Sequence, residues 1–235
     1  MSKRAVILAG GKGTRLKPYT ITIPKPLVPI GDTSILEMII QQLVDNEFKH
    51  ITITINHQAE LIKAYIGDGS KWGITIDYSL EDIPLKTMGP LKLISNLPEN
   101  YLIMNGDILT DINYSEFYNY HIDNKNLFTI SSFERKHLID YGELATHNSI
   151  LTGFKEKPIL NIEVSMGIYM MSKTLLKYIP KNTPYGFDDL MLDLLKNNVS
   201  VNVRKHGGSW LDIGRPKDYE HAIEQFQNNK SKYLK

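Results

Sequence analysis

The chain has 235 residues, of which 42% are hydrophobic and 23% charged, and its formal net charge is +1 at pH 7. The length suits one large α/β domain or two small ones, and the near-neutral charge argues against nucleic acid as a main partner. The sequence contains no cysteine, which excludes disulfides and thiolate metal sites. We expect no signal peptide and no membrane-spanning segment, and therefore a cytoplasmic protein.

The first predicted element is a short apolar strand at 5–9, which runs directly into a glycine-rich loop at 10–13. Glycines let the backbone approach a ligand closely and present several N–H groups to one phosphate. Arg15 adds a planar fork of donors, and Lys25 adds a cation on a segment stiffened by two prolines. The stretch therefore predicts a site for phosphates.

Two common phosphate-binding motifs do not fit this loop. Leu16 occupies the position where the dinucleotide-binding fingerprint needs its third glycine, and the Walker pattern is absent. These differences argue against a dehydrogenase and against a P-loop NTPase.

The next elements alternate between helix and strand. Ser34 and Glu37 form a capping box before a helix whose apolar residues repeat every 3.6 residues. Further strands are predicted at 50–55, 74–79, 101–104 and 127–133, and further helices at 59–66, 88–95 and 115–124, the last capped by Ser115. This order predicts a parallel sheet with helices on its faces.

The pattern changes at about 134, where short β-like runs follow one another up to 172. Beyond them we predict a helix capped by Ser172, a helix at 187–196, strands at 199–204 and 210–213, and a polar helix at 215–228. No linker or internal repeat interrupts the chain, so we expect one domain over 1–235. Its nucleotide-binding half would cover about 1–133, and its β-rich half about 134–235.

The motif L-A-G-G-x-G-T-R-L, followed ten residues after Arg15 by Lys25 in P-K-P, resembles the signature of the sugar-1-phosphate nucleotidyltransferases, the NDP-sugar pyrophosphorylases. The resemblance runs from Ala5 to about Ala222. It implies a doubly wound, mixed but mainly parallel α/β sheet with a β-rich sugar-binding insertion. It also implies transfer of a nucleotidyl group from an NTP to a sugar 1-phosphate, for surface polysaccharide or glycoconjugate precursors.

This chemistry brings two polyanions together, so cations and a divalent metal should dominate the site. The resemblance makes Arg15 and Lys25 the catalytic cations and assigns Mg²⁺ to Asp107 and Asp212. Asp107 follows a predicted central strand, where open α/β sheets bind ligands. Asp212 lies in an otherwise apolar run, where a carboxylate needs a cation or donors.

The resemblance places the nucleotide between the first loop and a segment that begins at Glu81. The nucleotide-binding residues so implied are Leu8, Ala9, Gly10, Gly11, Gly13, Thr14, Glu81, Thr87, Gly89 and Asp107. Lys86 departs from the family pattern, which commonly has a glycine at this position. If that position takes a positive φ, lysine introduces backbone strain.

Three further segments resemble the sugar-binding parts of the family. In the E-K-P segment, Lys157 would contact the sugar phosphate and Glu156 a sugar hydroxyl. The backbone of Gly142 would face the sugar, and Ser165 would lie on the strand that lines the sugar site. A plain core strand explains the segment around Ser165 almost as well.

The sequence does not determine which nucleotide base or which sugar the protein uses, nor its oligomeric state. The compact form with a G-P-L segment resembles the mannose- and heptose-1-phosphate guanylyltransferases, which favours GTP. A thymidylyl- or cytidylyltransferase of the same mechanism is an alternative, and so is a non-catalytic regulatory subunit that binds nucleotide sugars. The charged residues at all the expected positions disfavour the regulatory subunit, and the lack of a D-x-D motif disfavours a glycosyltransferase. A homo-oligomer is compatible with the sequence.

Overall fold

The computed structural model describes residues 3–234, and its centre is a seven-stranded sheet with the order β12-β8-β11-β6-β1-β4-β5. Among the strands described for this sheet, β11 alone runs antiparallel to its neighbours. The strands are β1 Lys3–Leu8, β4 Phe48–Ile55, β5 Thr75–Leu80, β6 Asn100–Asn105, β8 Phe128–Leu138, β11 Ile159–Ser172 and β12 Val201–Lys205. The predicted mixed, mainly parallel α/β sheet is confirmed.

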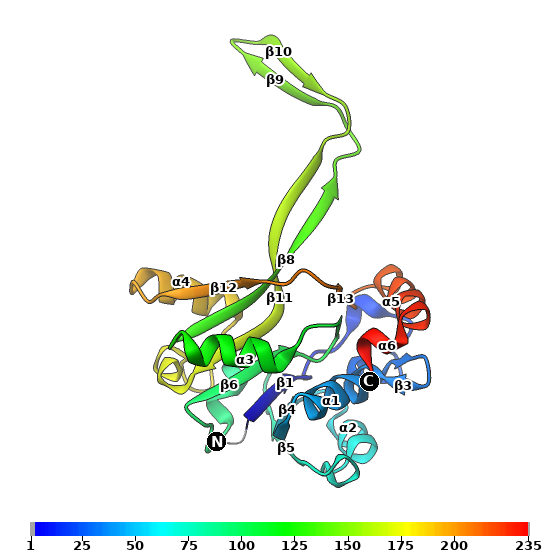
Figure 1. Cartoon of the computed structure of the whole chain (residues 1–235), viewed down its shortest axis with the longest axis vertical. Coiled ribbons are helices and arrows are strands. Elements are labelled where there is room, and N and C mark those ends of the chain that lie inside the picture. Colours follow the sequence, from blue (N-terminus) through cyan, green and yellow to red (C-terminus); the bar gives the residue numbers. More distant parts are fainter. Residues whose placement is uncertain (1–2, 235) are drawn as a thin grey trace.

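Helices cover both faces of the sheet (Figure 1). They are α1 Ile35–Asp45, α2 Ala59–Ile66, α3 Tyr114–Asp123, α4 Phe187–Lys196, α5 Pro216–Asn228 and α6 Lys230–Tyr233. Alternate residues of β1 point to opposite sides, because successive side chains of a strand face opposite ways. Ile7 joins the apolar core under α1, α2 and α5, whereas Val6 joins the core under α4. The sheet is therefore doubly wound.

Several predicted boundaries hold, and two predicted helices are shorter and tighter than expected. The capping box of α1 is present, with Ser34 Oγ accepting from Glu37 N at 3.2 Å. The predicted helix at 88–95 is a 3₁₀ helix at Gly89–Leu93. Tyr185 O accepts from both Met88 N and Gly89 N, so a distant segment fixes the start of this turn. The helix after Ser172 is also a 3₁₀ helix, Lys173–Tyr178, and Ser172 caps it.

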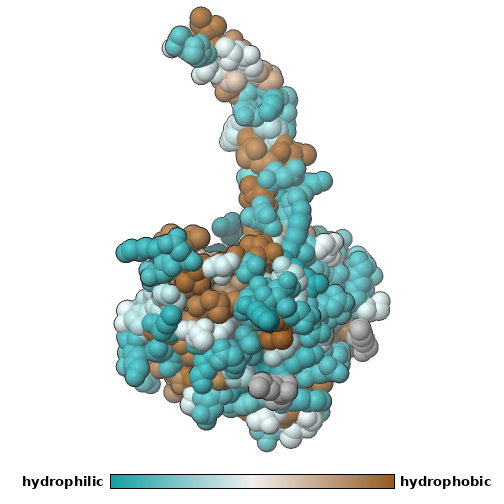
Figure 2. Space-filling model, turned by 60° about the vertical axis from the view of Figure 1, so that its left-hand side comes forward, coloured by the Kyte–Doolittle hydropathy of each residue, from teal (hydrophilic) through white to brown (hydrophobic). Residues whose placement is uncertain are grey.

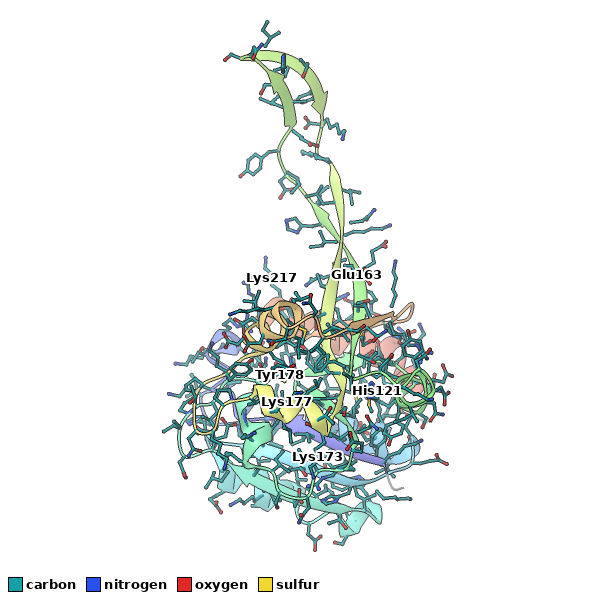
Figure 3. All side chains as sticks on the ribbon, turned by 90° about the vertical axis from the view of Figure 1, so that its left-hand side faces the viewer. His121, Glu163, Lys173, Lys177, Tyr178 and Lys217 are labelled. Carbon is teal, nitrogen blue, oxygen red and sulfur yellow. The ribbon has the colours of Figure 1, made fainter. Side chains whose placement is uncertain are left out.

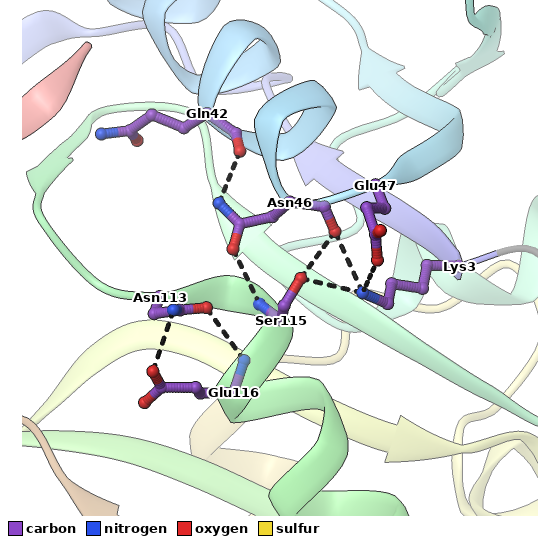
Figure 4. Close-up of polar contacts among 7 residues, drawn as sticks. All are labelled: Lys3, Gln42, Asn46, Glu47, Asn113, Ser115 and Glu116. Atoms are coloured by element: carbon purple, nitrogen blue, oxygen red, sulfur yellow. Dashed lines mark hydrogen bonds and ion pairs between the residues drawn. The ribbon is translucent and has the colours of Figure 1, made fainter. Parts of the chain in front are cut away.

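The prediction that Ser115 caps α3 is wrong. Asn113 is the cap, and its side-chain oxygen accepts from Glu116 N at 3.0 Å. Ser115 instead joins α3 to the end of α1, because its hydroxyl donates to Asn46 O at 2.7 Å and its N–H donates to Asn46 Oδ1 at 2.9 Å (Figure 4). Lys3 Nζ donates to the same carbonyl at 3.1 Å. Both Asn and Ser suit a cap, and tertiary contacts decide between them.

The loop between β1 and α1 contains two short 3₁₀ helices, Thr14–Leu16 and Lys25–Leu27, and a small hairpin of β2 Pro29–Ile30 and β3 Thr33–Ser34. Near the other end of the chain, β7 Ile108–Thr110 pairs antiparallel with β13 Trp210–Asp212. The pair of β7 and β13 lies at the carboxyl edge of the sheet, because β7 follows the end of β6 and β13 ends at Asp212.

The most unusual feature is a long ribbon that leaves the body. Beyond the sheet, β8 and β11 continue as a twisted pair, and β9 Glu143–His147 and β10 Ile150–Lys155 form its far end (Figure 1). We call residues 134–164 the arm. The predicted β-rich segment is thus present, but it projects from the body (Figure 2).

Within residues 3–234, no helix has the length and apolar character needed to cross a membrane.

Candidate active site

A cleft of about 380 Å³ opens at the carboxyl edge of the sheet, beside the ends of β1 and β6. The chain passes from β1 to β4 and β5 on one side and then returns to β6 on the other, so this is a topological switch point. Open α/β sheets bind ligands at such points, outside the carboxyl ends of their strands. The lining comes from the predicted loop, the segment after β5, and the end of β6. The lining residues that the sequence predicted are Leu8, Gly10, Gly11, Glu81, Thr87 and Asp107.

The glycine-rich loop forms one wall of this cleft. A Cβ at Gly10 would lie 2.6 Å from Glu81 Oε1, so a larger residue there would displace that carboxylate. Gly13 has a φ of 62°, in the left-handed region that favours glycine. Its carbonyl accepts from Thr20 Oγ1 at 2.7 Å, which ties the loop to the following segment.

Lys25 and Asp107, 82 residues apart in the chain, meet in this region. Lys25 Nζ forms an ion pair with Asp107 Oδ2. The other carboxylate oxygen, Oδ1, is buried and has no hydrogen-bond partner among the residues that the structure describes. A buried acceptor without a donor is costly, so this oxygen is suited to a cation.

The pairing of β7 with β13 brings Asp212 to the same place. Asp212 pairs in register with Ile108, and Ile213 N donates to Asp107 O at 3.0 Å. Desolvation raises the pKa of Asp212, and the neighbouring Asp107 carboxylate raises it further, whereas the cations of Lys25 and Arg15 lower it. The two predicted aspartates and the two predicted cations therefore form one electrostatic cluster.

The segment after β5 forms the opposite wall. Glu81 is buried, and its Oε2 accepts from Leu85 N at 2.9 Å. Burial raises the pKa of Glu81, and the Leu85 N–H opposes that rise. Thr87 also faces the cleft, while its hydroxyl oxygen accepts from Phe187 N at 2.8 Å.

Lys86 departs from the glycine of the family pattern, and it does adopt a left-handed backbone, with a φ of 61°. Its ammonium forms an ion pair with Asp189 Oδ2 at 2.9 Å. This contact holds the segment against the start of α4. The predicted strain at this position is therefore present, and an ion pair between the two segments accompanies it.

Three of the predicted sugar-binding residues lie elsewhere. Gly142, Glu156 and Lys157 are on the arm, which projects from the body (Figure 1), and no arm residue lines the cleft. Ser165 lies at the root of the arm, where its hydroxyl donates to the Tyr169 hydroxyl at 3.1 Å. Their roles toward a sugar stay predictions.

Sequence reasoning missed several residues that line the cleft, among them Lys12, Asn56 and Asn105. Asn56 follows β4, and its amide donates to Glu81 O at 2.6 Å. Asn105 is the last residue of β6. Both amides stand at the carboxyl ends of parallel strands, and that position is the signal that would have identified them.

The nucleotidyl transferase family model matches residues 4–229 of this chain. The UTP–glucose-1-phosphate uridylyltransferase of Synechocystis is 31% identical over 94% of this chain and 62% of its own length. The mannose-1-phosphate guanyltransferase of Gibberella zeae is 28% identical over 92% and 62%. The crystal structure of HddC from Yersinia pseudotuberculosis complexed with GMP-PN has a TM-score of 0.73 and 27% identity, covering 95% of this chain and 99% of that one.

The chain therefore belongs to the nucleotidyl transferase family, and the resemblance that its motifs predicted is confirmed. The residues matched by the family model include both walls of the cleft and the arm. The chain spans about three-fifths of the length of these two curated relatives.

Proposed function

We propose that this protein transfers a guanylyl group from GTP to a mannose- or heptose-type sugar 1-phosphate, releasing pyrophosphate. The observation that carries the proposal is the cluster of Arg15, Lys25, Asp107 and Asp212 beside a cleft at the switch point of the sheet. Such a cluster suits chemistry on phosphates, in which cations and a metal offset charge that develops on the transferred group.

The two aspartates fit Mg²⁺. Asp107 Oδ1 is a buried acceptor without a donor within residues 3–234, and the Asp212 carboxyl shares its surroundings. Mg²⁺ commonly takes one or two protein carboxylates and completes its shell with water and substrate phosphates. When bound, the ion would polarise the phosphoryl oxygens and offset their charge.

The chain's own residues would bind and orient the substrates. The N–H groups of the loop at 10–13 would hold the phosphates, and Arg15 and Lys25 would offset the charge on the transferred and leaving groups. The attacking phosphate oxygen of the sugar is already ionised at neutral pH, so positioning and charge stabilisation are sufficient and a general base is unnecessary.

Glu81 supports guanine as the base. Its carboxylate borders the cleft, with Oε1 next to Gly10 and Oε2 held by Leu85 N–H. An ionised carboxylate only accepts hydrogen bonds, and guanine offers the neighbouring N1–H and N2–H donors, whereas uracil and thymine offer a single N3–H. Relatives named as mannose-1-phosphate guanyltransferases, and HddC complexed with GMP-PN, favour the same base.

A second candidate uses UTP and glucose 1-phosphate. It is favoured by the Synechocystis relative, which is 31% identical to this chain and is named a UTP–glucose-1-phosphate uridylyltransferase. The mechanism and the residues would be the same, and only the contacts to base and sugar would differ.

The test is to measure pyrophosphate release for each common NTP paired with mannose, glucose and heptose 1-phosphates. We expect the highest kcat/KM for GTP with a mannose- or heptose-type sugar, and loss of activity when EDTA removes Mg²⁺. Preference for UTP with glucose 1-phosphate would replace the first candidate with the second. Absence of pyrophosphate release with every pair would overturn both and would favour a binding subunit.

A further inference from the structure

The arm exposes an unusual amount of apolar surface. Nine of its large apolar side chains are exposed by 47% to 79%: Leu138, Tyr141, Leu144, Ile150, Leu151, Phe154, Ile159, Leu160 and Ile162. Figure 2 shows apolar side chains along its whole length, and Figure 3 shows the side chains projecting freely from the ribbon. An isolated two-stranded ribbon is marginally stable in water, and large exposed apolar surfaces mark contact sites. The arm therefore needs a surface that covers it.

A polar cluster lies midway along the arm, where the pairing of β8 with β11 gives way to that of β9 with β10. A Cβ at Gly142 would lie 2.5 Å from the Phe154 ring and 3.5 Å from Glu156 Oε2, so these segments are in contact. Lys157 has a φ of 44°, and the next residue, Pro158, accepts from Ile139 N at 3.0 Å. Gly142, Phe154 and Glu156 thus lie close together here, Lys155 and Lys157 flank Glu156 in the chain, and Lys155 Nζ lies 3.9 Å from Glu143 Oε2.

This cluster is held away from the cleft of its own chain. From the edge of the body outward, β8 and β11 stay paired in unbroken register, from Phe133 with Val164 to Leu138 with Ile159. Six residue pairs extend over roughly 20 Å. Folding the cluster back onto its own cleft would require breaking part of this ladder.

The arm leaves the sheet at the edge where the cleft opens. Strand β8 is parallel to β6, because both are antiparallel to β11, which lies between them. Its carboxyl end, where the arm begins, therefore lies at the same edge as Asp107. Two copies that face each other across these edges would each extend an arm over the other's cleft.

The body adds apolar surface beside the root of the arm. A hollow of about 430 Å³ is lined there by Val164 together with Phe187, Met191, Leu195 and Val203. Glu163 lies at the root of the arm (Figure 3), and its carboxylate accepts a hydrogen bond from Ser132 Oγ. The exposed apolar surface thus continues from the arm onto α4 and β12, which favours a broad partner over a small ligand.

We propose that the protein is a two-fold symmetric dimer in which the arm of each chain covers the cleft of its partner. The cluster of Gly142, Lys155, Glu156 and Lys157 would then bind the sugar phosphate in the partner's site. A second copy fits because a two-fold contact is self-complementary and closes, covering both arms at once. The substrate role of the cluster rests on the proposed function. The arm exchange rests on the exposed apolar surface of the ribbon and on its departure from the body at the edge of the cleft.

The decisive test uses purified heterodimers with two different tags. One chain carries Lys157→Ala and the other Asp107→Asn, each of which is expected to be inactive as a homodimer. In the exchanged dimer, the cleft of the Lys157→Ala chain receives an intact arm, so the heterodimer should regain about half of the wild-type activity. If each arm serves its own cleft, both sites stay defective and no activity returns, which would overturn the proposal.

The matched control places both substitutions on one chain and pairs it with a wild-type chain. With exchanged arms, each site then has one defect and the heterodimer is inactive. With arms that serve their own clefts, the wild-type chain keeps its site and about half of the activity remains. The two arrangements thus predict opposite results for the two pairings.

Light scattering tests the dimer without any catalytic readout. We expect the mass of a dimer for the wild type, and of a monomer for the double variant Leu144→Glu, Ile150→Glu on the arm. Leu61→Glu, an exposed apolar residue of α2, should leave the dimer intact. A monomeric wild type would overturn the arm exchange. A dimer that shows no activity with any substrate pair would instead contradict only the proposed function.

Discussion

At the residue scale, His121 is a buried polar group whose protonation opposes folding. It lies on α3 (Figure 3), is fully buried, and its ring nitrogens lie 2.9 Å from Thr129 Oγ1 and 3.0 Å from Asn100 Oδ1. Burial lowers the pKa of His121 to about 4 from the ordinary 6.5. The folded protein therefore keeps this imidazole neutral over a range in which the unfolded chain takes up a proton.

We predict that the free energy of unfolding decreases as the pH falls from 6.5 to about 4, since only the unfolded state binds the extra proton there. A shift of this size corresponds to about 3 kcal/mol. Urea denaturation across this pH range measures the effect. His121→Gln should be less sensitive to pH in the same window, and an equal slope in both proteins would contradict the assignment.

At the scale of elements, α3 depends on a cap that also determines where the helix begins. Asn113 Oδ1 accepts from Glu116 N, and Asn113 Nδ2 donates to Glu116 Oε1 at 3.0 Å (Figure 4). Two residues later, Ser115 connects the first turn of α3 to the carboxyl end of α1. The first turn therefore has two separate supports, one within the helix and one from α1.

Asn113→Ala should lower the free energy of unfolding by about 1 kcal/mol, because one N–H at the start of α3 loses its acceptor. Asn113→Ser keeps an oxygen at the cap and should lose much less. Chemical denaturation at neutral pH compares the three proteins. Equal losses for alanine and serine would show that the hydrogen bond from Glu116 N to the cap is not the source of the stabilisation.

At the scale of the whole molecule, arm exchange couples stability to concentration. Association stabilises the folded state by mass action, so the Tm of a dimer rises with protein concentration. Calorimetry over a range of about 100-fold in concentration should show this rise for the wild type. The arm variant Leu144→Glu, Ile150→Glu should have a constant Tm. A constant wild-type Tm would argue against the exchange.

The sequence by itself predicted most of the elements, the mainly parallel sheet and the family. The capping box of α1, the strand at the start of the chain and the loop from Gly10 to Arg15 are encoded locally, by side-chain period and by glycine. Asp107 was predictable as a ligand-binding residue because it follows the carboxyl end of a strand, where open α/β sheets bind ligands. The same rule would have identified Asn56. The family followed from the loop and the two later aspartate motifs.

Only the tertiary structure decided which distant residues meet. The pairing of β7 with β13 joins Asp107 to Asp212, and no local pattern encodes a contact between segments about a hundred residues apart. Local signals also suited both Asn113 and Ser115 as caps, and the contact with Asn46 decided between them. The β-rich segment was predictable, but its direction was not, because whether a ribbon covers its own body or projects from it depends on long-range packing. Lys157 is therefore on an arm outside its own cleft, although its motif alone suggested a residue within the site.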